Sequence, residues 1–184
     1  MKKIILGLIV LFLFTNISCS DDTSENNEEN KVENVNDNQD NQDNQDNDDI
    51  DNEAFVVPEV KSIETEIVNL INAYRVDNGL VALQLEQGFV KVKAKEHSLY
   101  MIDKNAISHD LFDARADEII KKVKANRVGE NVAYGYITAK DVVDAWIASE
   151  GHRENILGNY NYFEISAEQT NSGVWYFTNI FIKK

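Results

Sequence analysis

Residues 174–183 read VWYFTNIFIK, and this stretch decides the fold. Successive side chains of a β-strand point to opposite faces of the sheet, so Trp175 and Phe181 share one face while Tyr176 and Ile182 share the other. Both faces of the strand are therefore largely apolar. Because a strand of this kind needs cover on both sides, the sequence predicts a sheet enclosed between two layers of helices.

The segments before this strand supply the rest of the predicted domain. Residues 162–169 are rich in β-forming residues, and the turn sequence TNSG at 170–173 joins them to the last strand as a hairpin. Four amphipathic stretches come earlier, so helices precede strands. This order predicts an α/β (α+β) fold, a three-layer α-β-α sandwich within residues 58–184.

The four expected helices have recognisable start and stop signals. They run from after Pro58 to Gly79, over 86–104, over 112–124, and from Thr138 to Gly151. Asp110 is expected to cap the third helix, and Thr138 with Asp141 resembles a capping box for the fourth. Gly151 is expected to end that helix, with a short turn after it.

The N-terminus has the layout of a signal peptide. Two lysines precede an apolar run that ends at Phe14, and small and polar residues lead to Cys19. The run is too short for a membrane-spanning helix, which needs about 20 apolar residues. The NISC sequence at 16–19 resembles a bacterial lipobox, with Asn where Leu is usual. The sequence predicts a signal peptide at 1–18 and a lipidated Cys19, with a plain secretory signal as the alternative.

The lipid would make the membrane a partner of the chain. A lipoprotein signal delivers a diacylated cysteine, and two acyl chains suffice for stable anchoring. The SDD sequence at 20–22 resembles the acidic tag that routes some lipoproteins to the outer cell surface. We therefore expect an exported protein that is anchored to the bacterial cell envelope, at the outer membrane or the cell surface.

An acidic segment at 19–57 separates this anchor from the domain. It consists mainly of Asn, Asp, Gln and Glu and contains three consecutive NQD copies at 38–46. Such a segment cannot bury enough apolar surface to offset the entropy of ordering, so we predict a disordered tether with a reach of roughly 35 Å. Calcium binding is the alternative, but an EF-hand loop needs a glycine that this run lacks.

Most of the net charge of −14 lies outside the domain. Residues 20–57 carry 14 acidic side chains against Lys31, whereas residues 58–184 carry 18 acidic and 15 basic ones. The nearly neutral domain shows no basic stripe, so we expect no nucleic-acid partner. With the single cysteine lipidated, the mature domain has no thiol nucleophile, no disulfide and no cysteine-based zinc site.

Three histidines and one glutamate are the candidates for chemistry. His97 lies on the apolar face of the second helix, where a hydrogen-bonded core histidine is the favoured interpretation. His109 lies in a short polar connection and His152 at the break after the fourth helix, and such positions often hold binding groups. Glu130 lies in the polar sequence GEN. Spacing alone gives no local metal motif, so whether these side chains meet stays open.

Several blocks of sequence together resemble one known family. They are NAYR at 72–75, NGL at 78–80, EHS at 96–98, SH at 108–109, GENV at 129–132 and WIASEGHRENIL at 146–157. In this order they resemble the bacterial CAP pattern, from the family of cysteine-rich secretory proteins, antigen 5 and plant pathogenesis-related proteins. The resemblance covers about residues 62–184, and residues 146–157 are its most specific part.

This resemblance implies an α-β-α sandwich with a cleft lined by two histidines and acidic residues. It brings three residues into one site, namely His109, Glu130 and His152. Further cleft-lining candidates are Ser149, Asn131 and His97. The eukaryotic branch has a second Glu at the position of Ser149, so the cluster is incomplete here, and ISAE at 165–168 replaces a glycine-containing strand, which puts the local sheet edge in doubt.

Three interpretations of the site remain open. The domain is a binding module for a small molecule, a glycan or a protein, and the resemblance to sterol- and lipid-binding family members implies a lipid. Alternatively it is a metal-dependent hydrolase or peptidase, in which His109 and His152 hold Zn²⁺ or another divalent metal and Glu130 is a ligand or the catalytic base. In the third interpretation these residues form a purely structural hydrogen-bonded cluster.

Overall fold

A computed structural model describes residues 56–184 of the chain. The expected signal peptide, the lipidation site at Cys19 and the tether up to residue 55 lie outside the described residues. Within the part that is described, no helix is both long and apolar enough to span a membrane.

The two long strands of the hairpin follow all the helices, as the sequence predicts, whereas two further strands lie between helices. The elements are α1 (Ser62–Asp77), β1 (Gln84–Leu85), α2 (Phe89–Lys104), α3 (Phe112–Val123), β2 (Arg127–Tyr134), α4 (Ala139–Ala148), α5 (Glu150–Ile156), β3 (Tyr162–Gln169) and β4 (Trp175–Lys183). The strands form one sheet in the order β1-β3-β4-β2, in which β1 pairs with β3 in parallel and the other pairs are antiparallel.

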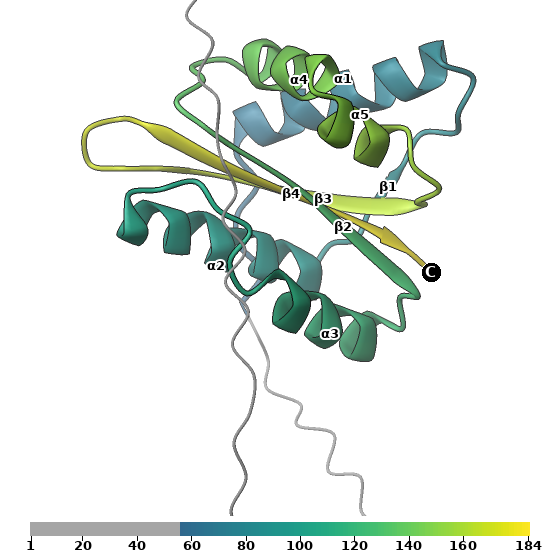
Figure 1. Ribbon diagram of the computed structural model, residues 1–184, viewed down its shortest axis with the longest axis horizontal. Helices are drawn as coiled ribbons and strands as arrows, with labels where there is room; N and C mark the ends of the chain where they lie inside the picture. Colours follow the sequence, from purple (N-terminus) through teal and green to yellow (C-terminus); the bar gives the residue numbers. More distant parts are fainter. Residues whose placement is uncertain (1–55) are drawn as a thin grey trace, which may run out of the picture. The chain divides into compact units, whose positions relative to one another are not determined.

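Two layers of helices enclose this sheet (Figure 1). Helices α1, α4 and α5 cover one face, and α2 and α3 cover the other. On the first face Phe177 and Phe181 of β4 pack in one core with Trp146, whereas on the second Ile180 and Ile182 form another core with α2 and α3. Each fully buried side chain of this size contributes roughly 1.5–3 kcal/mol. The predicted α-β-α sandwich, and its origin in the two apolar faces of β4, are confirmed.

For the caps of α1, α3 and α4, two predictions were correct and one was wrong. The Thr138 hydroxyl accepts a hydrogen bond from the backbone N–H of Asp141 at 3.1 Å, as expected for an N-cap. Gly79 follows α1 with a φ of +75°, as a helix stop does. Asp110 does not cap α3, because Leu111 holds the N-cap position and the Asp110 carboxylate instead accepts a hydrogen bond from Tyr100.

The segment after α4 differs from the prediction. The chain breaks at Ser149, whose backbone is extended, and resumes at once as α5, which contains Gly151. A glycine inside a helix costs only about 1 kcal/mol relative to alanine, and the contacts of α5 with β2 described below outweigh that cost. The short turn expected here is therefore a helix.

Strand β2 was not expected, because the polar GEN sequence gives no strand signal. It nevertheless pairs with β4 along its whole length, from Arg127 opposite Lys183 to Tyr134 opposite Tyr176. Its polar side chains are buried against partners from distant segments. The ISAE sequence at 165–168 also causes no disruption, since these residues pair regularly with β4.

Candidate functional site

The outer edge of β2 is covered by the segment from Trp146 to Leu157. An edge strand presents unpaired backbone groups that other chains can pair with. Here the indole Nε1 of Trp146 donates to the carbonyl oxygen of Val132 at 3.1 Å, and the amide of Asn155 donates to the carbonyl oxygen of Glu130 at 3.1 Å. The most specific sequence block of the chain therefore satisfies this edge of the sheet.

Asn131 and Gly129 fix helix α5 against β2. The fully buried Asn131 amide donates to the carbonyl oxygen of His152 at 3.0 Å and accepts from Asn155 at 2.9 Å. A Cβ atom at Gly129 would collide with the Tyr160 hydroxyl and with the Asn155 side chain. Glycine is thus needed for close approach and asparagine for hydrogen bonding, which explains the polar GEN sequence inside a strand.

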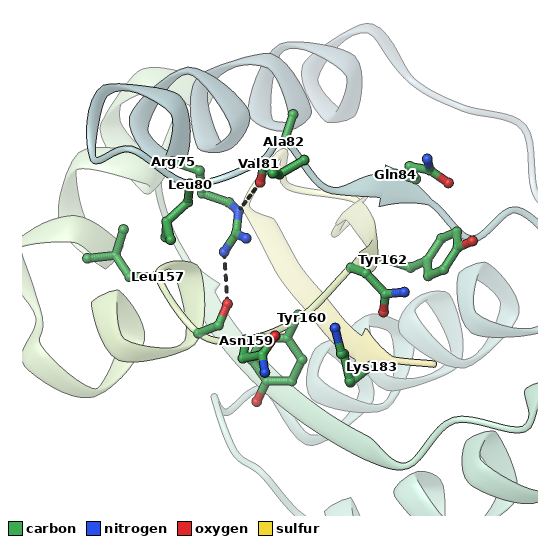
Figure 2. Close-up of a pocket in the computed structure, with 12 residues that line it drawn as sticks. Arg75, Leu80, Val81, Ala82, Gln84, Leu157, Asn159, Tyr160, Tyr162 and Lys183 are labelled. Atoms are coloured by element: carbon green, nitrogen blue, oxygen red, sulfur yellow. Dashed lines mark hydrogen bonds between the residues drawn. The ribbon is translucent and has the colours of Figure 1, made fainter.

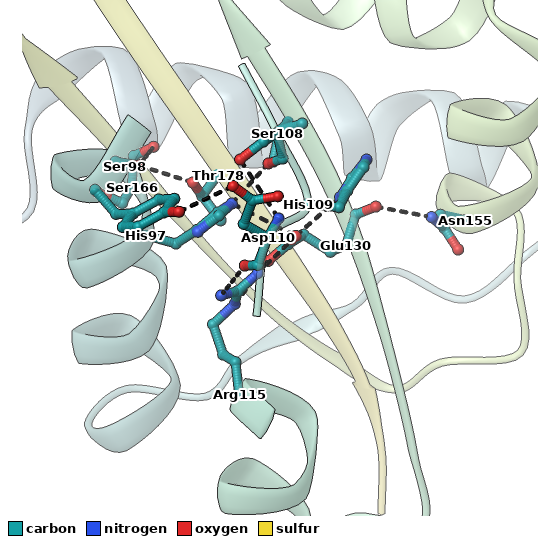
Figure 3. Close-up of polar contacts among 12 residues, drawn as sticks. His97, Ser98, Ser108, His109, Asp110, Arg115, Glu130, Asn155, Ser166 and Thr178 are labelled. Atoms are coloured by element: carbon teal, nitrogen blue, oxygen red, sulfur yellow. Dashed lines mark hydrogen bonds and ion pairs between the residues drawn. The ribbon is translucent and has the colours of Figure 1, made fainter. Parts of the chain in front are cut away.

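The Glu130 carboxylate, only 1% exposed, lies at the centre of a polar cluster (Figure 3). Arg115 from α3 donates from Nε to one carboxylate oxygen and from Nη2 to the other, both at 2.9 Å. His109 donates from Nδ1 to Oε1, also at 2.9 Å. A two-pronged guanidinium contact is among the strongest charge-assisted pairs, so both carboxylate oxygens are engaged.

His97 completes the inner side of this cluster. It is 3% exposed, its Nε2 donates to the carbonyl oxygen of Ser108 at 2.8 Å, and the same nitrogen lies 3.8 Å from Glu130. Burial lowers the pKa of His97, an effect that the charge of Glu130 opposes. The interpretation of His97 as a hydrogen-bonded core histidine is confirmed.

His109 and His152 lie close enough to interact electrostatically. Burial lowers the pKa of His152, and the neighbouring charge of His109 lowers it further. The His109 side chain is 52% exposed, and its Nδ1 is the nitrogen that contacts Glu130. Among residues 56–184, no group of three or more His, Cys, Asp or Glu side chains is arranged to hold a metal ion.

These residues fit a metal in part. Metal-binding histidines usually donate their second ring nitrogen to a carboxylate that orients them, and His109 and Glu130 have this relation. His109 is therefore oriented as a metal-binding histidine would be. Glu130 does not fit as a third ligand or as a general base, because Arg115 and His109 already engage both of its oxygens.

A hollow of about 370 Å³ opens beside this cluster. Its lining residues are His109, Phe112, Arg127, Val128, Gly129, Glu130, Asn155 and Tyr160. The cleft-lining candidates lie elsewhere: Asn131 supports α5 from within the core, His97 lines a neighbouring hollow of about 240 Å³, and Ser149 lies at the junction of α4 and α5.

Sequence reasoning missed Arg115, Asn155 and Tyr160 as parts of the site. Asn155 lies within the block at 146–157, so the resemblance offered a signal for it. Arg115 offered none, because it is one of several charged residues on an amphipathic helix and only the tertiary fold brings it to Glu130.

A wider hollow of about 530 Å³ lies between the end of α1 and the segment after α5 (Figure 2). Its buried Arg75 donates to the carbonyl oxygens of Val81, Ile156 and Gly158 at 3.1, 2.6 and 3.0 Å. Burial lowers the pKa of Arg75. Arg75 therefore joins three chain segments beside this hollow.

Comparison with known proteins accounts for these features. The model of the cysteine-rich secretory protein family, CAP, matches residues 68–181, which is more than half of the chain. The chain belongs to the CAP family. The resemblance found in the sequence is thereby confirmed, and two of the blocks that carried it, at 129–132 and 146–157, join α5 to β2 in this CAP domain.

Two Bacillus subtilis proteins are related to this CAP chain. YkwD is 37% identical over 129 residues, which are 68% of this chain and 49% of the relative. The membrane protein YlbC is 32% identical over 125 residues, which are 66% of this chain and 34% of the relative. The chain thus spans half or less of the length of these relatives.

Solved structures share the same architecture. An extracellular protein with an SCP domain from Bacillus anthracis aligns with a TM-score of 0.56 at 26% identity, covering 66% of this chain and 40% of its own. An outer surface protein from Borrelia burgdorferi aligns with a TM-score of 0.62 at 23% identity, covering 70% of this chain and 98% of its own. The Borrelia likeness is one of fold.

Proposed function

We propose that this protein is an exported, lipid-anchored CAP protein that acts at the cell envelope, at the outer membrane or cell surface. Its domain presents to a ligand the hollow of about 370 Å³ beside Glu130, which we call the β2-edge cleft. Export and anchoring are supported by the signal layout and Cys19. Export is also supported by the structurally similar Bacillus anthracis protein, which is an extracellular protein. The acidic segment at 19–57 gives the anchored domain its reach.

The hydrogen bonds that Arg115 and His109 make to the Glu130 carboxylate favour a binding module over a hydrolase. A general base must accept a proton, and a carboxylate held by an arginine fork and a histidine has no free oxygen for that task. Fixed partners also keep the cleft wall rigid, which lowers the entropic cost of binding. The site is therefore built to hold a ligand rather than to transform it.

The lining of the cleft suits a small amphipathic molecule, such as a lipid or the edge of a glycan or protein. Phe112 and Tyr160 offer apolar ring surface, while His109, Arg127 and Asn155 offer polar groups. Pockets that bind small molecules commonly combine apolar walls with a few polar groups that fix orientation.

A divalent cation such as Zn²⁺ forms part of this proposal. His109 and His152 would hold it, and Glu130 would keep the Nδ1 proton of His109 in place so that Nε2 is the ligating nitrogen. When bound, the cation supplies a positive charge that attracts an anionic or carbonyl group of the ligand.

Calorimetric titration with Zn²⁺ tests the cation, using a chain that begins at Ser20 and variants His109→Ala and His152→Ala. We expect binding in the parent chain and its loss in both variants. Glu130→Gln, which keeps the shape of the side chain, should weaken binding by about 10- to 100-fold, because it alters orientation and removes no ligand. Unchanged Zn²⁺ binding in His152→Ala would show that His152 is not a ligand of the cation.

A peptidase screen of the same chain, with and without chelator, tests the hydrolase alternative. We expect no turnover in either condition. Turnover that the chelator abolishes would overturn the assignment as a binding module and return Glu130 or another group to a catalytic role.

Metabolic labelling with a tagged fatty acid tests the anchor. The parent chain should become labelled and the Cys19→Ser variant should not. Equal labelling of both chains would show that the lipid, if any, is attached elsewhere.

A further inference from the structure

A further hollow, of about 160 Å³, lies against the outer side of β3 and shares no lining residue with the β2-edge cleft. Strand β1 pairs only with Tyr162 and Phe163, so the remainder of β3 has no strand beside it there. Its outward backbone groups bind side chains instead: Lys91 donates to the carbonyl oxygen of Ile165 at 2.5 Å, and Glu64 accepts from Ala167 at 2.8 Å.

The wall of this hollow is mainly apolar. Its apolar lining residues are Val57, Val60, Val68, Leu85 and Ile165. The charged lining residues are Glu64, Lys91 and Glu164. The hollow therefore has an apolar body with a charged end.

Glu164 is the feature of this hollow that lacks an explanation within the fold. It is 3% exposed, and its Oε1 atom has no hydrogen-bond partner. Buried polar atoms of native proteins are nearly always paired. Because Glu164 also lines the hollow, its incompletely paired carboxyl group can receive a hydrogen-bond donor from outside the chain.

The neighbouring lysine does not fill that need. Lys91 Nζ lies 2.8 Å from Glu64 and also donates to the Ile165 carbonyl oxygen, so its charge balances Glu64. Burial raises the pKa of Glu164 to about 8; Lys91 opposes this rise, and the negative charges of Glu86 and Glu64 add to it. When Glu164 is ionised, the hollow is thus one positive charge short.

We propose that this hollow is a binding site for a small primary ammonium group on a short aliphatic chain. The ammonium would donate to the Glu164 carboxylate, and the chain would pack against Val60, Val68 and Leu85. The volume of about 160 Å³ leaves room for a ligand of a few heavy atoms.

The experiment titrates the chain from Ser20 with n-butylammonium and, in parallel, with 1-butanol, and follows the backbone amide signals by NMR. We expect butylammonium to shift the signals of Val68, Leu85 and Ile165 in a saturable way. Butanol, which has the same chain without the charge, should bind about tenfold more weakly or worse, since hydrogen bonds to charged groups are about 1–2 kcal/mol stronger.

The pH dependence sharpens the test. Because the ammonium binds the ionised form of Glu164, its affinity should rise by up to about tenfold per pH unit between about pH 6 and about pH 8. Butanol should show no such rise. Equal affinities for the two ligands, or a flat pH profile for butylammonium, would overturn the proposal.

Three variants complete the design. Glu164→Gln should abolish the preference for butylammonium, and Val60→Phe, at a half-exposed position on the rim, should block both ligands. His109→Ala, in the other cleft, should leave butylammonium binding unchanged while it removes zinc binding, so the two proposals fail independently. Retained butylammonium binding in Val60→Phe would place the ligand elsewhere.

Discussion

Glu130 and Glu164 lie opposite the same residue of the central strand, one on each side of it. Both pair in register with Ile180 of β4, Glu130 from β2 and Glu164 from β3. Both are buried, yet Glu130 binds Arg115 and His109 while one oxygen of Glu164 binds nothing. Burial alone therefore does not determine the role of a glutamate. The number of its partners separates a carboxylate that supports structure from one that can receive a ligand.

The largest expected effect comes from removing the partner of Glu130. Arg115→Ala leaves a buried carboxylate without its cation, so we expect a loss of about 3–5 kcal/mol in the free energy of unfolding. Urea denaturation measures it. The double variant Arg115→Met with Glu130→Gln, which removes both charges, should recover most of the loss. A small effect of Arg115→Ala would mean that His109 alone stabilises Glu130.

Removing the charge of Glu164 should stabilise the protein at high pH, in contrast to the loss of stability expected at Glu130. Because its folded pKa of about 8 lies above the ordinary value of 4.5, the free energy of unfolding should fall as pH rises from about 4.5 to about 8. Glu164→Gln should remove this decline and stabilise the protein by about 1–3 kcal/mol at pH 8, with little effect near pH 4.5. Urea denaturation at both pH values is the measurement. Destabilisation at pH 8 would show that Glu164 has an ionic partner after all.

A third prediction concerns the close packing at the β2 edge. Gly129→Ala should destabilise by about 1 kcal/mol or more, because the added methyl group displaces Tyr160 and Asn155. Gly151→Ala is the matched control, since nothing lies within 4 Å of the added Cβ and alanine favours the helix. In thermal unfolding, Gly129→Ala should have a lower Tm than the parent chain, and Gly151→Ala should have a higher one.

The smallest expected effect is the response of the β2 edge to acid. The pKa values of His97 and His152 are lowered chiefly by burial, so the unfolded chain binds protons at pH values where the folded chain does not. The free energy of unfolding should therefore fall modestly as pH drops from about 7 to about 5. NMR titration of the imidazole signals checks this prediction, because both histidines should have pKa values below the ordinary value of 6.5.

The sequence predicted the layers of the fold because they depend on short-range patterns. The alternating side chains of β4 and the cap at Thr138 depend only on residues that are close in the sequence. Strand β2 and helix α5 escaped prediction because their polar residues are satisfied only by partners from distant segments, such as Asn131 by Asn155. The convergence of His109 and Glu130 came from the resemblance, whereas Arg115 and Glu164 carry no local signal of their role.

The donors of Trp146 and Asn155 along β2 have a consequence for a protein concentrated on a surface. Copies held to one membrane meet far more often than copies in solution, and open strand edges would let them join into sheets. Side chains that occupy the carbonyl oxygens of Val132 and Glu130 leave fewer groups for a neighbour to pair with. In a protein anchored as proposed above, the same contacts that shape the cleft would therefore help neighbouring copies to remain separate under two-dimensional crowding.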